Sequence, residues 1–166
     1  MTYSLDEKLF EDKGKIIRIF GEEFLKTNKD KCQMIIRGKE YEIKEKIKKS
    51  ELKQYGINEE EELEVILKGD GITDMSCMFW GCKSLVKLDL SSFDTKNVTS
   101  MRQMFYGCES LVKLDLLSFD TQNVISTEDM FIHCESLVKV IRKNFEKVKI
   151  ISRAYLRRSK FAIIEV

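Results

Sequence analysis

The chain has 166 residues, of which 43% are hydrophobic and 34% charged, and its formal net charge is +1 at pH 7. These values are typical of a soluble globular chain that can bury a core. They exclude a membrane span, since no stretch approaches the roughly 18 apolar residues that a span requires. The opening residues lack the basic start and apolar run of a secretory signal, so none is predicted.

Residues 1–62 are predicted to form a small α+β N-terminal cap. The sequence KIIRIFG at 15–21 indicates a strand, and CQMIIR with EYEI indicates a hairpin whose two-residue loop is Gly38–Lys39, a type II′ turn. The following EKIKKSELKQYG predicts a short helix that ends at Gly56. Proline is absent from the chain, so we expect no linker between this cap and the rest.

Residues 63–166 are dominated by a repeat of 26 residues, with copies at 75–100, 101–126 and 127–152 and a partial copy at 153–166. A fixed period of this length is typical of stacked repeats, in which equivalent side chains of successive copies form interior columns. We therefore predict a short leucine-rich-repeat-like solenoid with parallel strands and about five rungs. The columns are Met78, Met104 and Met130; Cys82, Cys108 and Cys134; Leu85, Leu111 and Leu137; and Phe93, Phe119 and Phe145.

Within each copy the SLVKLDL segment alternates as a half-buried strand does, with Leu85, Leu88 and Leu90 inward. The MFWGC and MFYGC segments predict a short helical turn that ends at a glycine with positive φ. His133 replaces this glycine in the third copy, so that turn is expected to differ. Residues 63–67 predict one strand ahead of the repeats. The final AIIEV predicts another, in which Ile163 is equivalent to Leu137.

The repeat, MxxMFxGCxSLxxLDLSSFDTxNVxS, resembles that of the BspA-like leucine-rich-repeat family of bacterial and protist surface proteins, over residues 72–152. The chain departs from the common consensus at Phe93 and Phe119, where that consensus has Asn or Cys. The resemblance implies an adhesin or interaction module at the cell surface, without catalytic residues or cofactors. It transfers no site residue to this chain.

The cysteines do not indicate disulfides or a zinc finger. Parallel side chains in the Cys82 column hold the Cβ atoms farther apart than a disulfide prefers, so buried, reduced thiols are predicted. The spacing of Cys77 and Cys82, and of His133 and Cys134, does not match a standard zinc site. Unpaired cysteines favour a reducing, cytoplasmic compartment, whereas the family resemblance favours the cell surface, so the location is left open.

No catalytic constellation is predicted, and the chain is not expected to be an enzyme. His133 and Cys134 are adjacent in sequence, so their side chains are expected to point apart. The run at 59–62 is expected to be a solvated loop, not a metal site. A basic tail closes the chain, and its nucleic-acid-binding interpretation is weaker than that of a polar terminal face; the tail residues are Arg153, Arg157, Arg158 and Lys160.

What remains is a binding surface on the outward side of the repeat strands. We expect a protein partner to bind there, with no specific nucleic acid and no membrane span; the oligomeric state is not predicted. The hypothesis is a non-catalytic protein–protein interaction or adhesion module. The alternative is a structural spacer or decayed paralogue without binding activity. The candidate partner-binding residues are Lys87, Asp89, Ser91, Lys113, Asp115, Leu117, Lys139 and Ile141.

Overall fold

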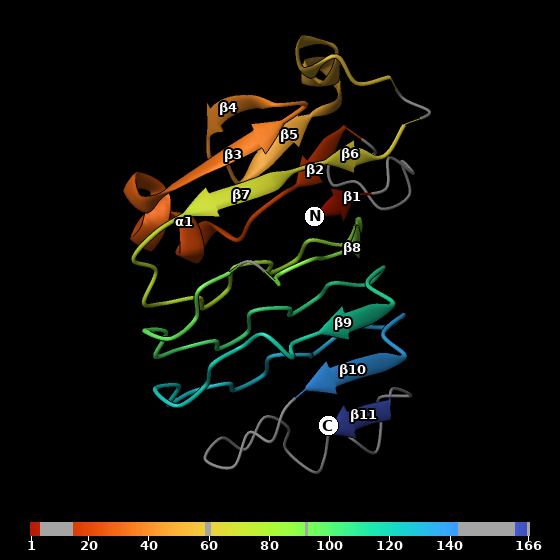
Figure 1. The fold of residues 1–166 in the computed structure, drawn as a ribbon. Helices are drawn as coiled ribbons and strands as arrows, with labels where there is room; N and C mark the ends of the chain where they lie inside the picture. The colour runs from red at the N-terminus through yellow and green to blue at the C-terminus, as the bar shows by residue number, and fades with distance from the viewer. Residues whose placement is uncertain (4–14, 59–60, 92, 143–161, 166) are drawn as a thin grey trace.

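A computed structural model describes residues 1–3, 15–58, 61–91, 93–142 and 162–165 (Figure 1). The elements before the repeats are β1 (Thr2–Tyr3), β2 (Ile16–Arg18), α1 (Glu22–Asn28), the 3-10 segment η2 (Lys29–Lys31), β3 (Cys32–Ile36), β4 (Lys39–Glu42), β5 (Lys46–Lys48), the 3-10 segment η3 (Lys49–Tyr55), β6 (Leu63–Glu64) and β7 (Ile66–Gly69). The repeats contribute β8 (Leu85–Lys87), β9 (Lys113–Asp115) and β10 (Lys139–Arg142), and β11 (Ala162–Glu165) follows them.

The prediction of an α+β cap followed by a parallel-strand solenoid of about five rungs is wrong. The described strands form four small sheets, and three of these are antiparallel: β6-β1-β8, β4-β3-β7 and β2-β5. Parallel pairing in the described residues is limited to β9-β10-β11 and to isolated bridges that join Asp74 to Ser100 and Ser100 to Ser126. Strands from both sides of residue 62 share two of the antiparallel sheets.

Two local features explain why the repeats do not build one continuous parallel sheet. Strand β1 pairs antiparallel with β8, so the first repeat strand belongs to a sheet with the N-terminus. The strands are also short: β8 ends at Lys87, before Leu88, and β9 ends at Asp115. The predicted solenoid required Leu88 and Leu114 to lie on paired parallel strands, and in the structure they do not.

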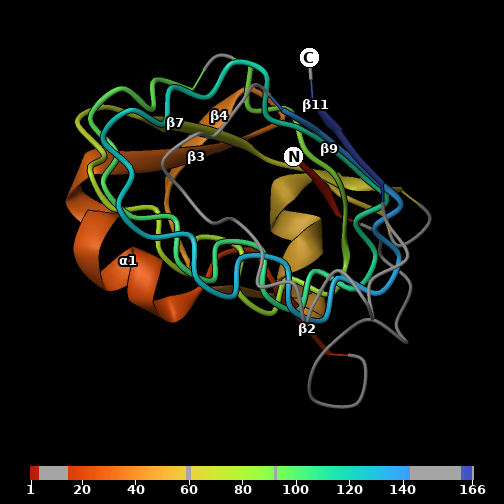
Figure 2. The same cartoon turned by 90° about the horizontal axis from the view of Figure 1, so that it is seen from below.

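The repeat copies are nevertheless in register, because hydrogen bonds join their turns. Main-chain N–H groups of one copy donate to carbonyl oxygens of the next, as in Met75 to Ser100 at 2.9 Å and Phe79 to Met104 at 2.8 Å. The bonds Met101 to Ser126 at 2.8 Å and Phe105 to Met130 at 3.1 Å repeat this pattern. Seen from below in Figure 2, the traces of the copies follow one another closely. Turn-to-turn hydrogen bonds thus take the place of long strands.

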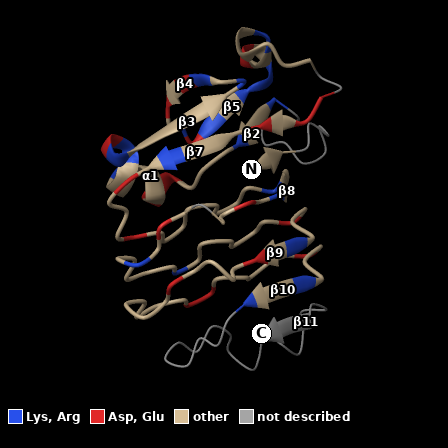
Figure 3. Cartoon of the chain, in the orientation of Figure 1, with Lys and Arg blue, Asp and Glu red and all other residues tan. Residues whose placement is uncertain are grey.

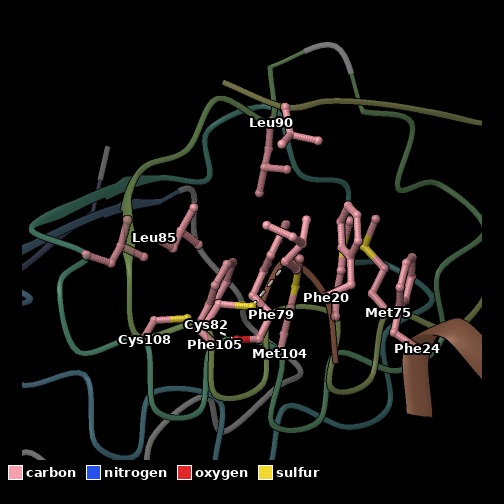
Figure 4. Close-up of a cluster of buried hydrophobic side chains, with 14 of the residues drawn as sticks. Phe20, Phe24, Met75, Phe79, Cys82, Leu85, Leu90, Met104, Phe105 and Cys108 are labelled. Carbon is pink, nitrogen blue, oxygen red and sulfur yellow. Dashed lines mark hydrogen bonds between the residues drawn. The ribbon is translucent and has the colours of Figure 1, made fainter. Parts of the chain in front are cut away.

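The interior columns predicted from the repeat are buried. The described Met78, Cys82 and Leu85 columns are each at most 7% exposed, and Figure 4 shows part of this core. The rings of Phe79, Phe105 and Phe131 stack with centroids 5.7 Å apart. In the fourth predicted column, Phe119 is buried and Phe93 half-buried, and Phe145 lies outside the described residues.

The segment at 19–21 closes one end of this stack. The Phe20 ring lies 6.0 Å from that of Phe79, and the Cys82 thiol donates to the carbonyl oxygen of Ile19. The Gly21 N–H donates to the Met78 carbonyl oxygen at 3.0 Å. A Cβ on Gly21 would lie 1.9 Å from the Cys77 carbonyl oxygen, so only glycine fits. The N-terminal segment and the first copy therefore share one core.

Several local predictions need correction. The two-residue loop of the β3–β4 hairpin is Arg37–Gly38, and positive φ at both residues (48° and 76°) fits a type I′ turn, not II′. Residues 63–67 form parts of two strands, β6 and β7, in different sheets. Strand β11 forms, but Ile163 pairs with Val140 and not with Leu137.

The turn at each repeat glycine was also only partly predicted. Gly81 and Gly107 both adopt a φ of 70°, as expected, but the segments before them form turns and not helices. His133 adopts a φ of 58°, so this third turn keeps the left-handed conformation that was expected to change. The predicted helix that ends at Gly56 is present as the 3-10 segment η3, and Gly56 has a φ of 70°.

Candidate binding surface

The structure distributes the predicted partner-binding residues over three repeat strands and the turns that follow two of them. Lys87 ends β8, Lys113 and Asp115 flank Leu114 in β9, and Lys139 and Ile141 belong to β10. The remaining three residues follow β8 or β9: Asp89, Ser91 and Leu117. The charged residues on β8 and β9 and the turn residues Asp89 and Ser91 are exposed, whereas Leu117, Lys139 and Ile141 are half-buried.

The two aspartates of this set have a structural task. The Asp89 carboxylate accepts a hydrogen bond from the Ser91 N–H at 2.9 Å, and that of Asp115 accepts one from the Leu117 N–H at 3.0 Å. Hydrogen bonds from the Ser91 side chain and backbone lower the pKa of Asp89. Each aspartate therefore holds the turn that ends its strand, as short acidic side chains commonly do. This makes them weaker candidates for partner contact than the sequence suggested.

The lysines of the set differ in their surroundings. Lys87 lies 3.6 Å from the Glu62 carboxylate, in an exposed ion pair. Lys113 and Lys139 are direct partners in the parallel pairing of β9 with β10. Within the described part of the chain, neither of them has an ion-pair partner. Figure 3 shows the resulting basic positions at the starts of β9 and β10, on the same side of the molecule.

An exposed valine precedes each of these two lysines, and the sequence analysis missed both. Val112 is 49% exposed and Val138 is 53% exposed. The Val138 N–H donates to the Val112 carbonyl oxygen at 2.9 Å, so the two valines lie side by side in adjacent repeat copies. The SLVKLDL pattern did contain a signal for this exposure. The inward positions of the segment are leucines, so the valine is not among the residues expected in the core. We call Val112, Lys113, Val138 and Lys139 the Val–Lys patch.

A second surface feature is a row of aromatic side chains beside the repeat glycines. The rings of Trp80 and Tyr106 stack with centroids 5.7 Å apart, and His133 meets Tyr106 edge-on at 5.3 Å. The Arg18 guanidinium covers the Trp80 ring at 5.6 Å. Neighbours in the row thus occupy the ring faces that a stacking ligand would need. This row stabilises the stack of copies and is a poor ligand platform.

The buried thiols act as hydrogen-bond donors. The thiols of Cys82, Cys108 and Cys134 donate to carbonyl oxygens of the preceding layer at 3.3, 3.2 and 3.0 Å. Burial raises the pKa of Cys108 well above its usual range and that of Cys134 to about 12. A nucleophilic cysteine needs a lowered pKa instead. His133 is exposed and packs on Tyr106, so the contacts of these residues do not form a Cys134–His133 dyad.

Other predicted features fall partly outside the described residues. The basic tail at Arg153, Arg157, Arg158 and Lys160 lies outside them, as does the 59–60 part of the acidic run. Among the residues that the structure describes, no cluster of three His, Cys, Asp or Glu side chains is arranged to hold a metal ion. In the same residues, no helix has both the length and the apolar character that crossing a membrane requires.

Comparison with known protein families gives a match over most of the chain. A family model described as "Mycoplasma protein of unknown function, DUF285" matches residues 61–163, which is more than half of the chain and includes the three full repeat copies. Searches of curated proteins and of solved structures found no match. The matched range begins just before β6 and ends within β11, so it contains all of the candidate surface. The chain therefore belongs to the DUF285 family of Mycoplasma proteins of unknown function.

Proposed function

We propose that the chain is a non-catalytic protein-interaction module that binds a partner through the exposed side of β8, β9 and β10. The supporting observation is the Val–Lys patch, in which two exposed valines lie next to two lysines without an ion-pair partner in the described residues. The side chains of these two valines lie outside the buried core, although main-chain hydrogen bonds join the two copies here. The apolar part of the patch gains free energy when a partner covers it, at roughly 25 cal/mol per Å².

The different roles of the stabilising residues and the outward residues within each repeat copy also support this function. Inward columns, turn aspartates and main-chain hydrogen bonds stabilise the stack, and they leave the outward strand positions free to vary. Repeat proteins commonly use such positions for recognition. The BspA-like resemblance of the repeat makes adhesion at a cell surface the more specific form of this proposal. The rival hypothesis is a structural spacer that binds nothing through this surface.

Affinity capture from a lysate of the source cell tests the proposal. The bait is the whole chain, compared with a Val112→Ser/Val138→Ser variant and with a matched control, Lys96→Ala/Gln122→Ala, whose exposed side chains lie on turns and do not belong to the patch. We expect proteins that the wild type and the control capture equally and that the valine variant loses. Equal capture by all three baits, or no capture above an unrelated bait, would favour the spacer.

A further inference from the structure

Two like charges face each other at the centre of the Val–Lys patch. Lys113 and Lys139 are Cα partners on neighbouring parallel strands, whose spacing is about 4.8 Å. Like charges directly opposite each other across a sheet are unfavourable. Asp115 lies two residues from Lys113, but its carboxylate accepts the Leu117 N–H and makes no ion pair with either lysine. The described residues therefore leave this pair of charges without a counter-charge.

At two other positions of the stack, equivalent residues of successive copies carry opposite charges and form ion pairs. Lys83 pairs with Glu109 at 2.8 Å, and Arg102 pairs with Glu128 at 3.2 Å; in both pairs the residues are one repeat apart. Such pairs favour the register of the copies. The Lys113–Lys139 pair opposes it, so its contribution to the isolated fold is unfavourable. An anionic partner would convert this contribution into a favourable one.

The apolar side chains of the patch limit what that partner is. Val112 and Val138 are about half exposed and lie in adjacent repeat copies, as their main-chain hydrogen bond shows. Valine side chains offer a phosphate backbone no hydrogen bond, and two lysines neutralise few phosphates, so the patch suits nucleic acid poorly. A protein segment supplies both carboxylates for the lysines and apolar side chains for the valines.

We propose that the Val–Lys patch binds an acidic protein segment in which two carboxylates lie beside apolar side chains. This inference deepens the proposed function and rests on it, since it specifies the chemistry of the partner. The long lysine side chains can reach carboxylates on an extended or a helical segment. Charge complementarity selects the partner, and burial of the two valines retains it.

Selection from a displayed library of random peptides tests the inference. Peptides are selected on the wild-type chain and counter-selected on a Lys113→Glu/Lys139→Glu variant whose folding is checked by circular dichroism. We expect enrichment of peptides that combine Asp or Glu with apolar residues. Synthetic versions, titrated by fluorescence anisotropy, should bind the variant at least about tenfold more weakly, because like charges now meet. A peptide with its carboxylates replaced by lysines should recover binding to the variant.

Controls separate charge alone from the complete patch. A Lys113→Gln/Lys139→Gln variant should also bind the selected peptides more weakly, without charge repulsion or a new negative surface. A peptide whose apolar residues are replaced by serine should lose affinity for the wild type. Tighter binding to a DNA oligonucleotide or to phosphatidylserine vesicles than to the peptides would overturn the inference.

The inference and the proposed function fail in different ways. If the selected peptides lack acidic residues, or bind the charge-reversed variant equally well, the acidic partner is wrong. The proposed function would still stand if the valine variant loses captured proteins. If no peptide is selected, the inference is overturned, and capture alone then decides between interaction module and spacer.

Discussion

The thiol of Cys108 donates a hydrogen bond to the carbonyl oxygen of Phe79, with 3.2 Å between the sulfur and the oxygen, and so joins two consecutive repeat copies. The same bond joins Cys134 to Phe105, and Cys82 to Ile19 in the N-terminal segment. A cysteine side chain fills the column and also satisfies a buried carbonyl group. This double role explains why the column holds Cys in all three copies.

Replacing Cys108 with alanine should destabilise the chain by about 1–3 kcal/mol, because the change leaves a small cavity and removes a donor from a buried carbonyl. Urea unfolding followed by circular dichroism measures the loss. Cys77→Ala is the matched control, since Cys77 is only half-buried. Equal effects of the two changes would contradict the role assigned to the column.

The buried thiols should resist modification. At pH 8, iodoacetamide should alkylate half-exposed Cys77 first, whereas Cys82, Cys108 and Cys134 should react only when the chain unfolds. Mass spectrometry of the time course identifies the modified residues. Alkylation of Cys108 in the folded chain as fast as that of Cys77 would show that the column is accessible.

The raised thiol pKa values also predict a loss of stability at high pH. Burial keeps Cys108 and Cys134 protonated in the folded chain, with the pKa of Cys134 at about 12. Their stabilising effect is complete below the unfolded-state pKa of about 8.5 and is lost as the pH rises toward 12. The free energy of unfolding should fall over this range, and less steeply in a Cys108→Ala/Cys134→Ala variant. Parallel curves for the two proteins would contradict this cause.

Asp115 should matter for the turn after β9. Asp115→Ala removes the acceptor of the Leu117 N–H and should cost about 0.5–1 kcal/mol, whereas Asp115→Asn keeps an oxygen acceptor and should cost less. Thermal unfolding of the two variants measures the difference. If both variants melt at the wild-type temperature but lose a captured partner, the carboxylate belongs to the binding surface and not to the turn.

Substitutions of His133 test whether the third copy needs its left-handed turn. His133→Val should destabilise the chain by about 1–2 kcal/mol, because a β-branched residue strongly disfavours positive φ. His133→Gly should have a small net effect, since it relieves strain and removes the ring contact with Tyr106. Urea midpoints rank the three proteins. A valine variant as stable as the wild type would mean that the turn readily adopts another conformation.

The sequence predicted the interior columns because residues at a fixed period face the same environment in each copy. The buried positions of Met78, Cys82 and Leu85 and of their equivalents confirm this. Strand pairing was predicted wrongly, since it depends on which strand competes for an edge. The two-residue N-terminal strand β1 pairs with the edge of β8, and the sequence of β1 contains no pattern that predicts this pairing.

Other features carried weak local signals. Helix α1 was missed because its N-cap is Gly21, which makes no side-chain capping bond. Left-handed φ at Cys77, Gln103 and Asp129 recurs one repeat apart, yet these residue types share no turn preference that the sequence could reveal. In the candidate surface, the sequence placed Lys113 and Lys139 correctly on repeat strands, but it could not show that the aspartates hold turns.

The central claim is that the outward side of β9 and β10 recognises another protein. The most direct test is the affinity of a captured partner for the wild type and for Lys113→Ala/Lys139→Ala, measured together with the melting temperatures of both. We predict at least about tenfold weaker binding at a melting temperature that is unchanged or higher, because the substitution also removes a repulsion between like charges. Unchanged affinity in the folded variant would contradict the claim.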